Sequence, residues 1–321
     1  MATKIPWVRN PDGTPGEIFN PIIGCTPVSP GCDNCWARRL HGQRYKARWP
    51  HGMPECYEKP FSQVRFLEGR LLQPVHWRKP RTVFVCSTSD LCHKDAPMAT
   101  VFDIFQVMAV AQRHRFLLLT KRPERMAQIL SHIGTMPTDG EKLTATWDDG
   151  HAIPLPNVAL GVTVENADYL GRLGDLLSIP AAMHFVSIEP MLGPVDLSPW
   201  LVGKGACREC GMPNATNWHG QHWTEWFDGD GDPQMELCGD VSMGGLDWVI
   251  CGAESGPHRR PFQEQWARDL RDQCIEAAVP FFYKQGRDAK NKVEHMPLLD
   301  GRTWTERPEW FFRGEKQCTS N

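Results

Sequence analysis

The sequence predicts an α/β protein built as a full or partial (β/α) barrel of about six parallel strands, with a cysteine-rich insertion. Two observations predict this fold. Short apolar segments alternate with helical patterns, and alternating βα units form parallel sheets with right-handed crossovers. Each apolar segment also ends in polar or charged residues, as strands do at the active-site face of α/β barrels. No Gly-x-Gly-x-x-Gly follows the first segment, which argues against a dinucleotide-binding fold.

The expected strands cover residues 82–86, 115–120, 158–164, 183–188, 246–251 and 279–283. Apolar residues at helical spacing predict helices over residues 97–114, 125–133, 167–177 and 263–278. Because the carboxyl ends of parallel strands meet at one edge of a sheet, we expect a polar pocket there. The residues at these ends are Ser87, Ser89, Asp90, Lys121, Arg122, Glu165, Asn166, Glu189, Glu254, Ser255 and Lys284.

Composition indicates a globular protein. The chain has 321 residues, of which 41% are hydrophobic and 23% are charged. We divide it into a barrel domain at residues 1–290, which contains an insertion at 191–245, and a C-terminal extension at 291–321. No apolar run is long enough to span a membrane and the start lacks the apolar region of a secretion signal, so we expect a cytoplasmic protein.

Three cysteines gather in one short segment. Cys25, Cys32 and Cys35 lie in a stretch rich in Pro and Gly that has no helical or strand periodicity. Three thiolates on a loop suit either a structural zinc with a fourth ligand elsewhere or an iron–sulfur cluster with one iron left open. Neither a histidine nor a fourth cysteine follows at the spacing of a zinc knuckle, which favours the cluster.

A second cysteine pair lies in the insertion. Cys207 and Cys210 form a Cys-x2-Cys motif, and His219, His222 and Cys238 follow. This pattern makes Cys207 and Cys210 candidate zinc ligands, although the second half lacks the usual spacing. The alternative is an ordinary surface insertion with free thiols.

A basic stretch follows the cysteine segment. Between residues 36 and 81, eleven Lys or Arg residues stand against three acidic ones, with aromatic residues between them. A charge run is often only a solvated face. The formal net charge of the chain is −3, however, so a local surplus of this size favours an anionic partner, and nucleic acid is the obvious candidate.

Several short motifs lie along the chain: residues 19–25 (FNPIIGC), 29–37 (SPGCDNCWA), 87–93 (STSDLCH), 119–126 (LTKRPERM), 161–166 (GVTVEN), 187–194 (SIEPMLGP), 251–256 (CGAESG) with 259–261 (RRP), and 280–285 (PFFYKQ). Taken together, these motifs resemble a phage-associated branch of the radical S-adenosylmethionine (SAM) superfamily. The longer gap between the first two cysteines, six residues instead of three, is typical of this branch.

The resemblance implies a cofactor chemistry. Cys25, Cys32 and Cys35 would bind three irons of a [4Fe–4S] cluster, and SAM would chelate the fourth iron. Electron transfer to SAM would give methionine and a 5′-deoxyadenosyl radical that abstracts a hydrogen atom from the substrate. The cofactor supplies the difficult chemistry, and the protein orients it and excludes water. An electron donor such as flavodoxin or ferredoxin is implied as a partner.

Within this resemblance, the strand ends receive roles by their position. Ser87, Ser89 and Asp90 are placed to receive the SAM ammonium group. Lys121 or Arg122 would pair with the SAM carboxylate, and Glu165 or Glu189 would bind the ribose hydroxyls. The later residues Glu254, Ser255 and Lys284 would face the substrate as catalytic groups.

Some members that resemble this chain serve thymidine hypermodification, by which phage DNA evades restriction. The predicted reaction is therefore isomerisation of an N-linked glycyl-thymidine in DNA to the C-linked form, in the host cytoplasm if the protein is phage-encoded. Two alternatives stay open. One is a radical SAM DNA repair lyase or methyltransferase. The other is a non-catalytic, zinc-stabilised DNA-binding module.

Overall fold

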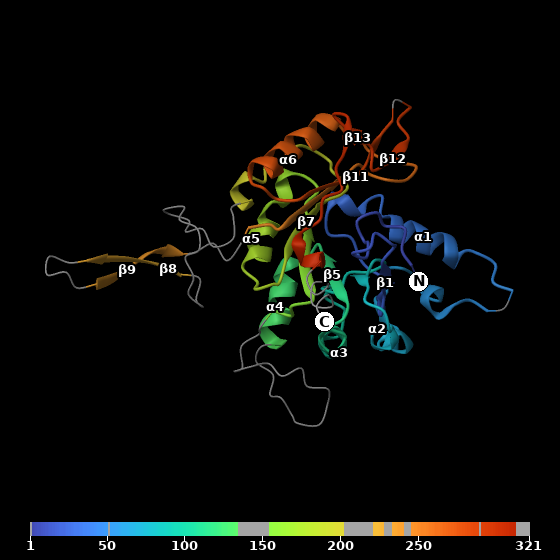
Figure 1. Ribbon diagram of the computed structural model, residues 1–321. Coiled ribbons are helices and arrows are strands. Elements are labelled where there is room, and N and C mark those ends of the chain that lie inside the picture. The colour runs from blue at the N-terminus through green and yellow to red at the C-terminus, as the bar shows by residue number, and fades with distance from the viewer. Residues whose placement is uncertain are drawn as a thin grey trace, which may run out of the picture.

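The protein is an α/β half-barrel (Figure 1). The computed structural model describes residues 2–50, 52–133, 154–201, 221–227, 233–240, 245–288 and 290–312. Within these residues, the main sheet has eight strands in the order β1-β4-β5-β6-β7-β10-β11-β12. Neighbouring strands are parallel from β1 to β11, and only β12 is antiparallel.

The six predicted strands are all present, and the α/β partial barrel is confirmed. They are β4 (Thr82–Val85), β5 (Arg115–Thr120), β6 (Val158–Thr163), β7 (His184–Ile188), β10 (Trp248–Gly252) and β11 (Phe281–Arg287). The strand number differs from the expected six because two more strands join the sheet edges. β1 (Glu17–Phe19) pairs with β4, and β12 (Val293–His295) pairs with β11.

Four helices cover one face of the sheet: α3 (Met98–Val110), α4 (Pro123–Ile133), α5 (Gly171–Leu177) and α6 (Glu264–Glu276). Their apolar side chains form one core with alternate residues of the strands, such as Val83, Leu118 and Val249. Each helix follows a strand and returns the chain to the next one, which is the right-handed crossover expected of a parallel sheet. α1 (Trp36–Tyr45) and α2 (Gln73–His76) lie before β4.

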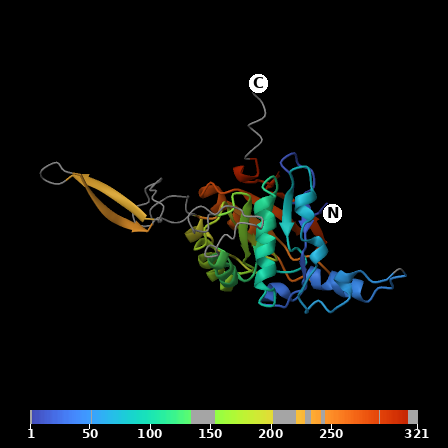
Figure 2. The same ribbon diagram turned by 90° about the horizontal axis from the view of Figure 1, so that it is seen from below.

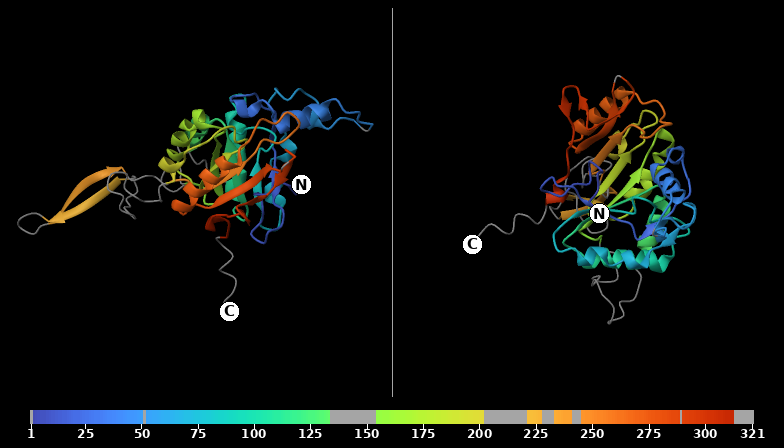
Figure 3. Two further views of the ribbon diagram at one scale, coloured as in Figure 1. Left: turned by 90° about the horizontal axis from the view of Figure 1, so that it is seen from above. Right: turned by 90° about the vertical axis from the view of Figure 1, so that its right-hand side faces the viewer.

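The opposite face of the sheet is closed by aromatic residues from both ends of the chain. Trp7 packs against Phe84 and Trp248 with ring centroids 4.9 and 5.9 Å apart, and Phe311 packs on Trp248 at 5.1 Å. Figure 3 shows the curved sheet in two further views. The segment that we named the C-terminal extension therefore adds β12 and buries Trp310 and Phe311 against the barrel.

Short pairs of strands complete the structure. β2 (Ile22–Ile23) pairs with β3 (Arg65–Phe66), and β13 (Leu298–Leu299) pairs with β14 (Arg302–Thr303), both antiparallel. β8 (Gln221–Phe227) and β9 (Pro233–Asp240) form an antiparallel hairpin that projects away from the sheet (Figure 2). None of the described helices is long and apolar enough to cross a bilayer.

The hairpin belongs to the insertion between β7 and β10, which are neighbours in the sheet. The two ends of the insertion meet, because the backbone N–H of Leu246 donates to the carbonyl of Trp200 at 2.9 Å. Asp247 also accepts from the backbone N–H of His184 at 2.7 Å. The chain thus leaves the barrel and re-enters it at one point.

Candidate functional site

The alternation of side chains along the strands places the predicted site residues on one face. Successive residues of a strand point to opposite faces. On β5 and just beyond it, Leu117 belongs to the aromatic face, so Lys121 lies on the same face four residues later. The same spacing links Phe185 on β7 with Glu189 just beyond it, and Ile250 on β10 with Glu254 just beyond it. The polar strand ends therefore lie above the apolar floor that Trp7 and Trp248 form.

The segment with the three cysteines crosses these strand ends. Gly24 forms a parallel bridge with Ser89 beyond β4. Gly24 has φ +86°, and an added Cβ would lie 2.4 Å from the carbonyl oxygen of Gln63, so the position requires glycine. Gly31 lies against β6, because a Cβ there would be 2.5 Å from Cγ of Glu165. We name residues 24–35 the cysteine loop.

An ion pair holds the Cys25 end of the cysteine loop. Arg122 Nη1 lies 2.6 Å from Asp90 Oδ2, and Arg122 Nη2 donates to the carbonyl of Thr26 at 2.8 Å. Arg122 Nη1 also lies 3.7 Å from the sulfur of Cys25. Asp90 accepts three further hydrogen bonds, from Thr120 Oγ1 at 2.7 Å and from the backbone N–H groups of Lys121 and Cys92. The guanidinium is therefore fixed between a carboxylate and the loop.

A buried histidine supports the same end. His93 Nδ1 accepts from the backbone N–H of Asp95 at 3.1 Å, so the neutral ring carries its proton on Nε2. Nε2 then donates to Thr26 Oγ1 at 2.7 Å. Burial is the largest effect on this ring and lowers the pKa of His93, which keeps it neutral near pH 7.

A buried carboxylate lies under the middle of the cysteine loop. Glu165 is 0% exposed, and its carboxylate lies 2.6 Å from Lys121 Nζ and 3.2 Å from Arg172 Nη1. Lys121 Nζ also lies 2.6 Å from Thr163 Oγ1. Burial raises the pKa of Glu165, but the charges of Lys121 and Arg172 outweigh it and the pKa is lowered. Two cations against one carboxylate leave one positive charge in this cluster.

The Cys32–Cys35 end is held by residues that follow β10. Asn34 Nδ2 donates to Glu254 Oε2 at 3.1 Å and to the carbonyl of His258 at 2.7 Å. Arg260 donates to Glu254 through its backbone N–H at 2.8 Å and through Nε at 3.0 Å. Arg260 also forms an ion pair with Asp33 at 3.4 Å. The structure therefore connects Glu254 to the cysteine loop.

The other predicted site residues lie at the same edge of the sheet. Glu189, which follows β7, forms an ion pair with Lys284. Lys284 lies within β11 and not at its end as expected, because the strand continues to Arg287. Ser89 Oγ donates to the carbonyl of Ile22 at 2.6 Å, and Ser87 exchanges hydrogen bonds with Asn20 at 3.2 Å. Ser255 is half-buried directly after Glu254.

The three thiols are free and partly accessible. Two of the sulfurs have a donor beside them: Arg122 near Cys25, and the backbone N–H of Arg38 at 3.5 Å from Cys35. Ser29 Oγ lies 3.9 Å from the sulfur of Cys32, and either group can donate in that contact. Burial raises the pKa of Cys25 to about 11. In the part of the chain that the structure describes, no three His, Cys, Asp or Glu side chains are already arranged to hold a metal ion. These three thiols fit an iron–sulfur cluster held by three cysteines, and we expect binding of such a cluster to bring the three sulfurs closer together.

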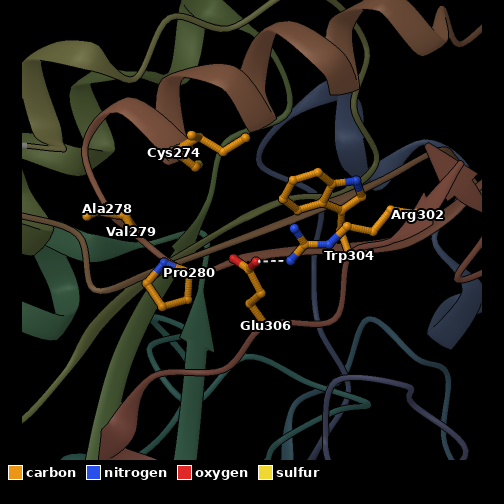
Figure 4. Close-up of a pocket in the computed structure, with 8 residues that line it drawn as sticks. Cys274, Ala278, Val279, Pro280, Arg302, Trp304 and Glu306 are labelled. Atoms are coloured by element: carbon orange, nitrogen blue, oxygen red, sulfur yellow. Dashed lines mark hydrogen bonds and ion pairs between the residues drawn. The ribbon is translucent and has the colours of Figure 1, made fainter. Parts of the chain in front are cut away.

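The candidate zinc ligands cannot be placed. Cys207 and Cys210 lie outside the described residues, as does the side chain of Cys238. A pocket of about 390 Å³ lies elsewhere, between α6 and β14, and is lined by Cys274, Trp304 and Glu306 among others (Figure 4). Pro280 and Val279 line it just before β11, so it opens at the amino ends of the strands, away from the cysteine loop.

Sequence reasoning assigned no role to three residues that hold this site, which are His93, Arg172 and Arg260. Arg172 had a signal, because it is a buried arginine among the leucines of α5. A buried arginine needs an anionic partner, and Glu165 is that partner.

Comparison with known proteins gives a family. The sequence matches the family described as "Protein of unknown function (DUF5131)" over residues 2–308, and the chain belongs to this family. No curated protein and no solved structure matches the chain.

Proposed function

We propose that this DUF5131 protein is a radical SAM enzyme that rearranges a modified base in phage DNA, isomerising N-linked glycyl-thymidine to the C-linked form. One observation carries the proposal. Three free thiols lie on a loop that crosses the polar carboxyl edge of a half-barrel. The motifs that resemble the radical SAM superfamily supply the loop and each of these strand ends.

In this proposal Cys25, Cys32 and Cys35 bind a [4Fe–4S] cluster. When bound, the cluster and SAM supply a 5′-deoxyadenosyl radical. The residues of the chain bind and orient SAM. Lys121 and Arg172 together carry one more positive charge than their shared partner Glu165 neutralises, so the Lys121 ammonium is the best partner for the SAM carboxylate. Ser87 and Ser89 retain acceptor capacity on their hydroxyl oxygens for the SAM ammonium.

The two acidic candidates for the ribose differ in access. Glu165 is fully buried under Gly31 and is occupied by Lys121 and Arg172. Glu189 is partly exposed and has one cationic partner, Lys284. Glu189 therefore suits the ribose hydroxyls better. The apolar floor of Trp7 and Trp248 excludes water from below the site, which protects a radical from unwanted hydrogen donors.

DNA is the proposed substrate because of the surface that follows Cys35. The last turn of α1 and the next residues expose Arg44, Tyr45, Lys46 and Arg48. Tyr45 stacks on His41 with ring centroids 6.2 Å apart, and one face of its ring is thus fixed by the protein. Cations that contact phosphates and a ring that stacks on a base are the two elements of single-strand recognition. A base must leave the duplex to reach an enclosed site, and stacking offsets part of that cost.

The first experiment tests the cofactor. The protein is reconstituted anaerobically with iron and sulfide and reduced, and its electron paramagnetic resonance spectrum is recorded with and without SAM. We expect a [4Fe–4S] signal that changes when SAM is added and is lost in Cys32→Ala. Cys56→Ala is the matched control, because Cys56 is a free, half-buried thiol outside the cysteine loop. Zinc at the three cysteines and no affinity for SAM would instead favour the DNA-binding module.

The second experiment tests the substrate. The loaded protein is incubated with SAM, a reductant and glycylated DNA, and the nucleosides are separated by chromatography. We expect a new nucleoside of unchanged mass and altered retention, since isomerisation moves a bond without adding atoms. Unchanged retention would exclude the isomerase. Transfer of isotope from the SAM methyl group would indicate a methyltransferase, and activity on irradiated DNA would indicate a repair lyase.

A further inference from the structure

Arg122 makes contacts that none of the other strand-end cations makes. Its guanidinium bridges the carboxylate of Asp90 at 2.6 Å, the carbonyl of Thr26 at 2.8 Å and the sulfur of Cys25 at 3.7 Å. Only 12% of its side chain is exposed. A planar guanidinium presents five donors in a fixed fork, so one arginine can hold a carboxylate, a carbonyl and a sulfur in set directions.

These contacts argue against Arg122 as the residue that binds the SAM carboxylate in the proposed function. A residue that binds the SAM carboxylate needs donors that point into the pocket. Both Nη groups of Arg122 already contact Asp90 or the cysteine loop, and Asp90 is held by three other donors. Lys121, which shares Glu165 with a second cation, therefore binds the SAM carboxylate instead.

We propose that Arg122 is a positioning residue that donates to the Cys25 thiolate and, with Asp90, sets the reduction potential of the cluster. This inference rests on the proposed function. Hydrogen bonds and charges near the sulfurs are among the factors that tune iron–sulfur potentials. A cation beside a ligand sulfur stabilises the more negative, reduced cluster and raises its potential. A carboxylate in the same place has the opposite effect.

The pair therefore predicts two shifts of opposite sign. Arg122→Gln leaves Asp90 near Cys25 without its cation, and we expect a lower potential. Asp90→Asn keeps the size of the side chain but replaces one carboxylate oxygen by an amide NH2 and removes the negative charge, and we expect a higher potential. A role limited to holding the loop predicts no such opposition, because both changes would loosen the same contacts.

The experiment is a redox titration of the reconstituted full-length protein, followed by the paramagnetic resonance signal of the reduced cluster without SAM. We expect the ratio of reduced to oxidised cluster at a fixed potential to change about tenfold in each variant, which is about 59 mV for one electron. Arg122→Lys should give a value between wild type and Arg122→Gln. Lys94→Gln is the control for removal of a nearby exposed cation, and its titration should match wild type.

Each outcome decides the inference. Opposite shifts in Arg122→Gln and Asp90→Asn support it. Shifts of the same sign, or none, overturn it, and so does a loss of SAM affinity in Arg122→Gln at unchanged potential. If Arg122→Gln assembles no cluster, Arg122→Lys and Asp90→Asn decide by the same criterion. A wild-type protein that assembles no cluster would instead contradict the proposed function, so the two failures are distinguishable.

Discussion

The two ends of the cysteine loop are held in different ways. At the Cys25 end, Asp90 and Arg122 have side chains that are only 8% and 12% exposed, and His93 is fully buried. At the Cys32–Cys35 end, Glu254 is also buried, with 5% of its side chain exposed, but its partner Arg260 is 30% exposed and Asp33 is 66% exposed. Both members of the ion pair are enclosed at the first end, whereas the contacts at the second end are partly open to solvent. The difference implies that Cys25 is the fixed reference point and that Cys32 and Cys35 adjust to what binds.

The largest effect is expected from breaking the buried end. Asp90→Ala removes the carboxylate and leaves Arg122 buried without its charge partner. Removal of one member of a buried ion pair costs about 3–5 kcal/mol of unfolding free energy. Urea unfolding of the metal-free protein measures this. The matched control is Asp103→Ala, an exposed position on α3, which should change stability by less than about 0.5 kcal/mol. A similar loss in both variants would contradict the comparison.

The middle of the loop gives the next largest effect, and it depends on pH. Glu165→Gln keeps the size of the side chain but removes the charge that faces Lys121 and Arg172. We expect a loss of about 2 kcal/mol at pH 7, since hydrogen bonds to charged groups contribute about 1.5–3 kcal/mol.

The sign of the pH dependence follows from the folded state. The pKa of Glu165 is lowered on folding, although its burial acts against this, because the neighbouring cations outweigh burial. The stabilisation is therefore complete above the unfolded pKa of about 4.3 and is lost as pH falls through the lower folded value. Urea unfolding at pH 7, 5.5 and 4 should give a difference between the two proteins that shrinks only at the lowest pH. A constant difference would contradict this assignment.

A smaller loss of stability is expected at the Cys32–Cys35 end of the cysteine loop. Glu254→Gln weakens the contacts with Arg260 and Asn34, which are partly open to solvent. We expect a loss of about 1–2 kcal/mol, below that of Asp90→Ala. Hydrogen exchange should show faster exchange in residues 32–35, with the backbone N–H of Cys25 unchanged. Equal acceleration at Cys25 would mean that the loop opens as one unit.

The smallest effect is expected for the most exposed pair. Asp33→Asn removes an ion pair with Arg260 whose acidic member is two-thirds exposed. Such pairs contribute about 0–1 kcal/mol and are screened by salt. Urea unfolding at low and high salt should show a loss below about 0.5 kcal/mol that disappears at high salt. A larger loss, independent of salt, would mean that this end is also part of the core.

The fold was predictable where the chain is regular and locally determined. The six parallel strands carry apolar runs, so the sequence alone predicts them. β1 was not predicted because it has three residues and pairs with β4, more than sixty residues later. α1 was not predicted because only Ala37 and His41 are buried on it, which leaves no apolar stripe in its sequence.

The site was predictable in part. Residues at strand ends follow from the period of two, which brings Lys121, Glu189 and Glu254 to one face. Their partners do not follow from any local pattern. Asn34 meets Glu254 across 220 positions of sequence, and Arg122 reaches Cys25 across 97. Such pairings depend on the three-dimensional path of the loop, which a single sequence does not specify.

The meeting of the two ends of the insertion, at Trp200 and Leu246, has a consequence for how this protein can vary. Because Leu246 bonds to Trp200 and β10 pairs directly with β7, the sheet keeps its register whatever lies between residues 201 and 245. Segments whose ends meet on a stable scaffold tolerate replacement well. The insertion between β7 and β10 can therefore be replaced as a unit. A different recognition element could take its place, in a relative or by engineering, while the barrel and its cysteine loop stay unchanged.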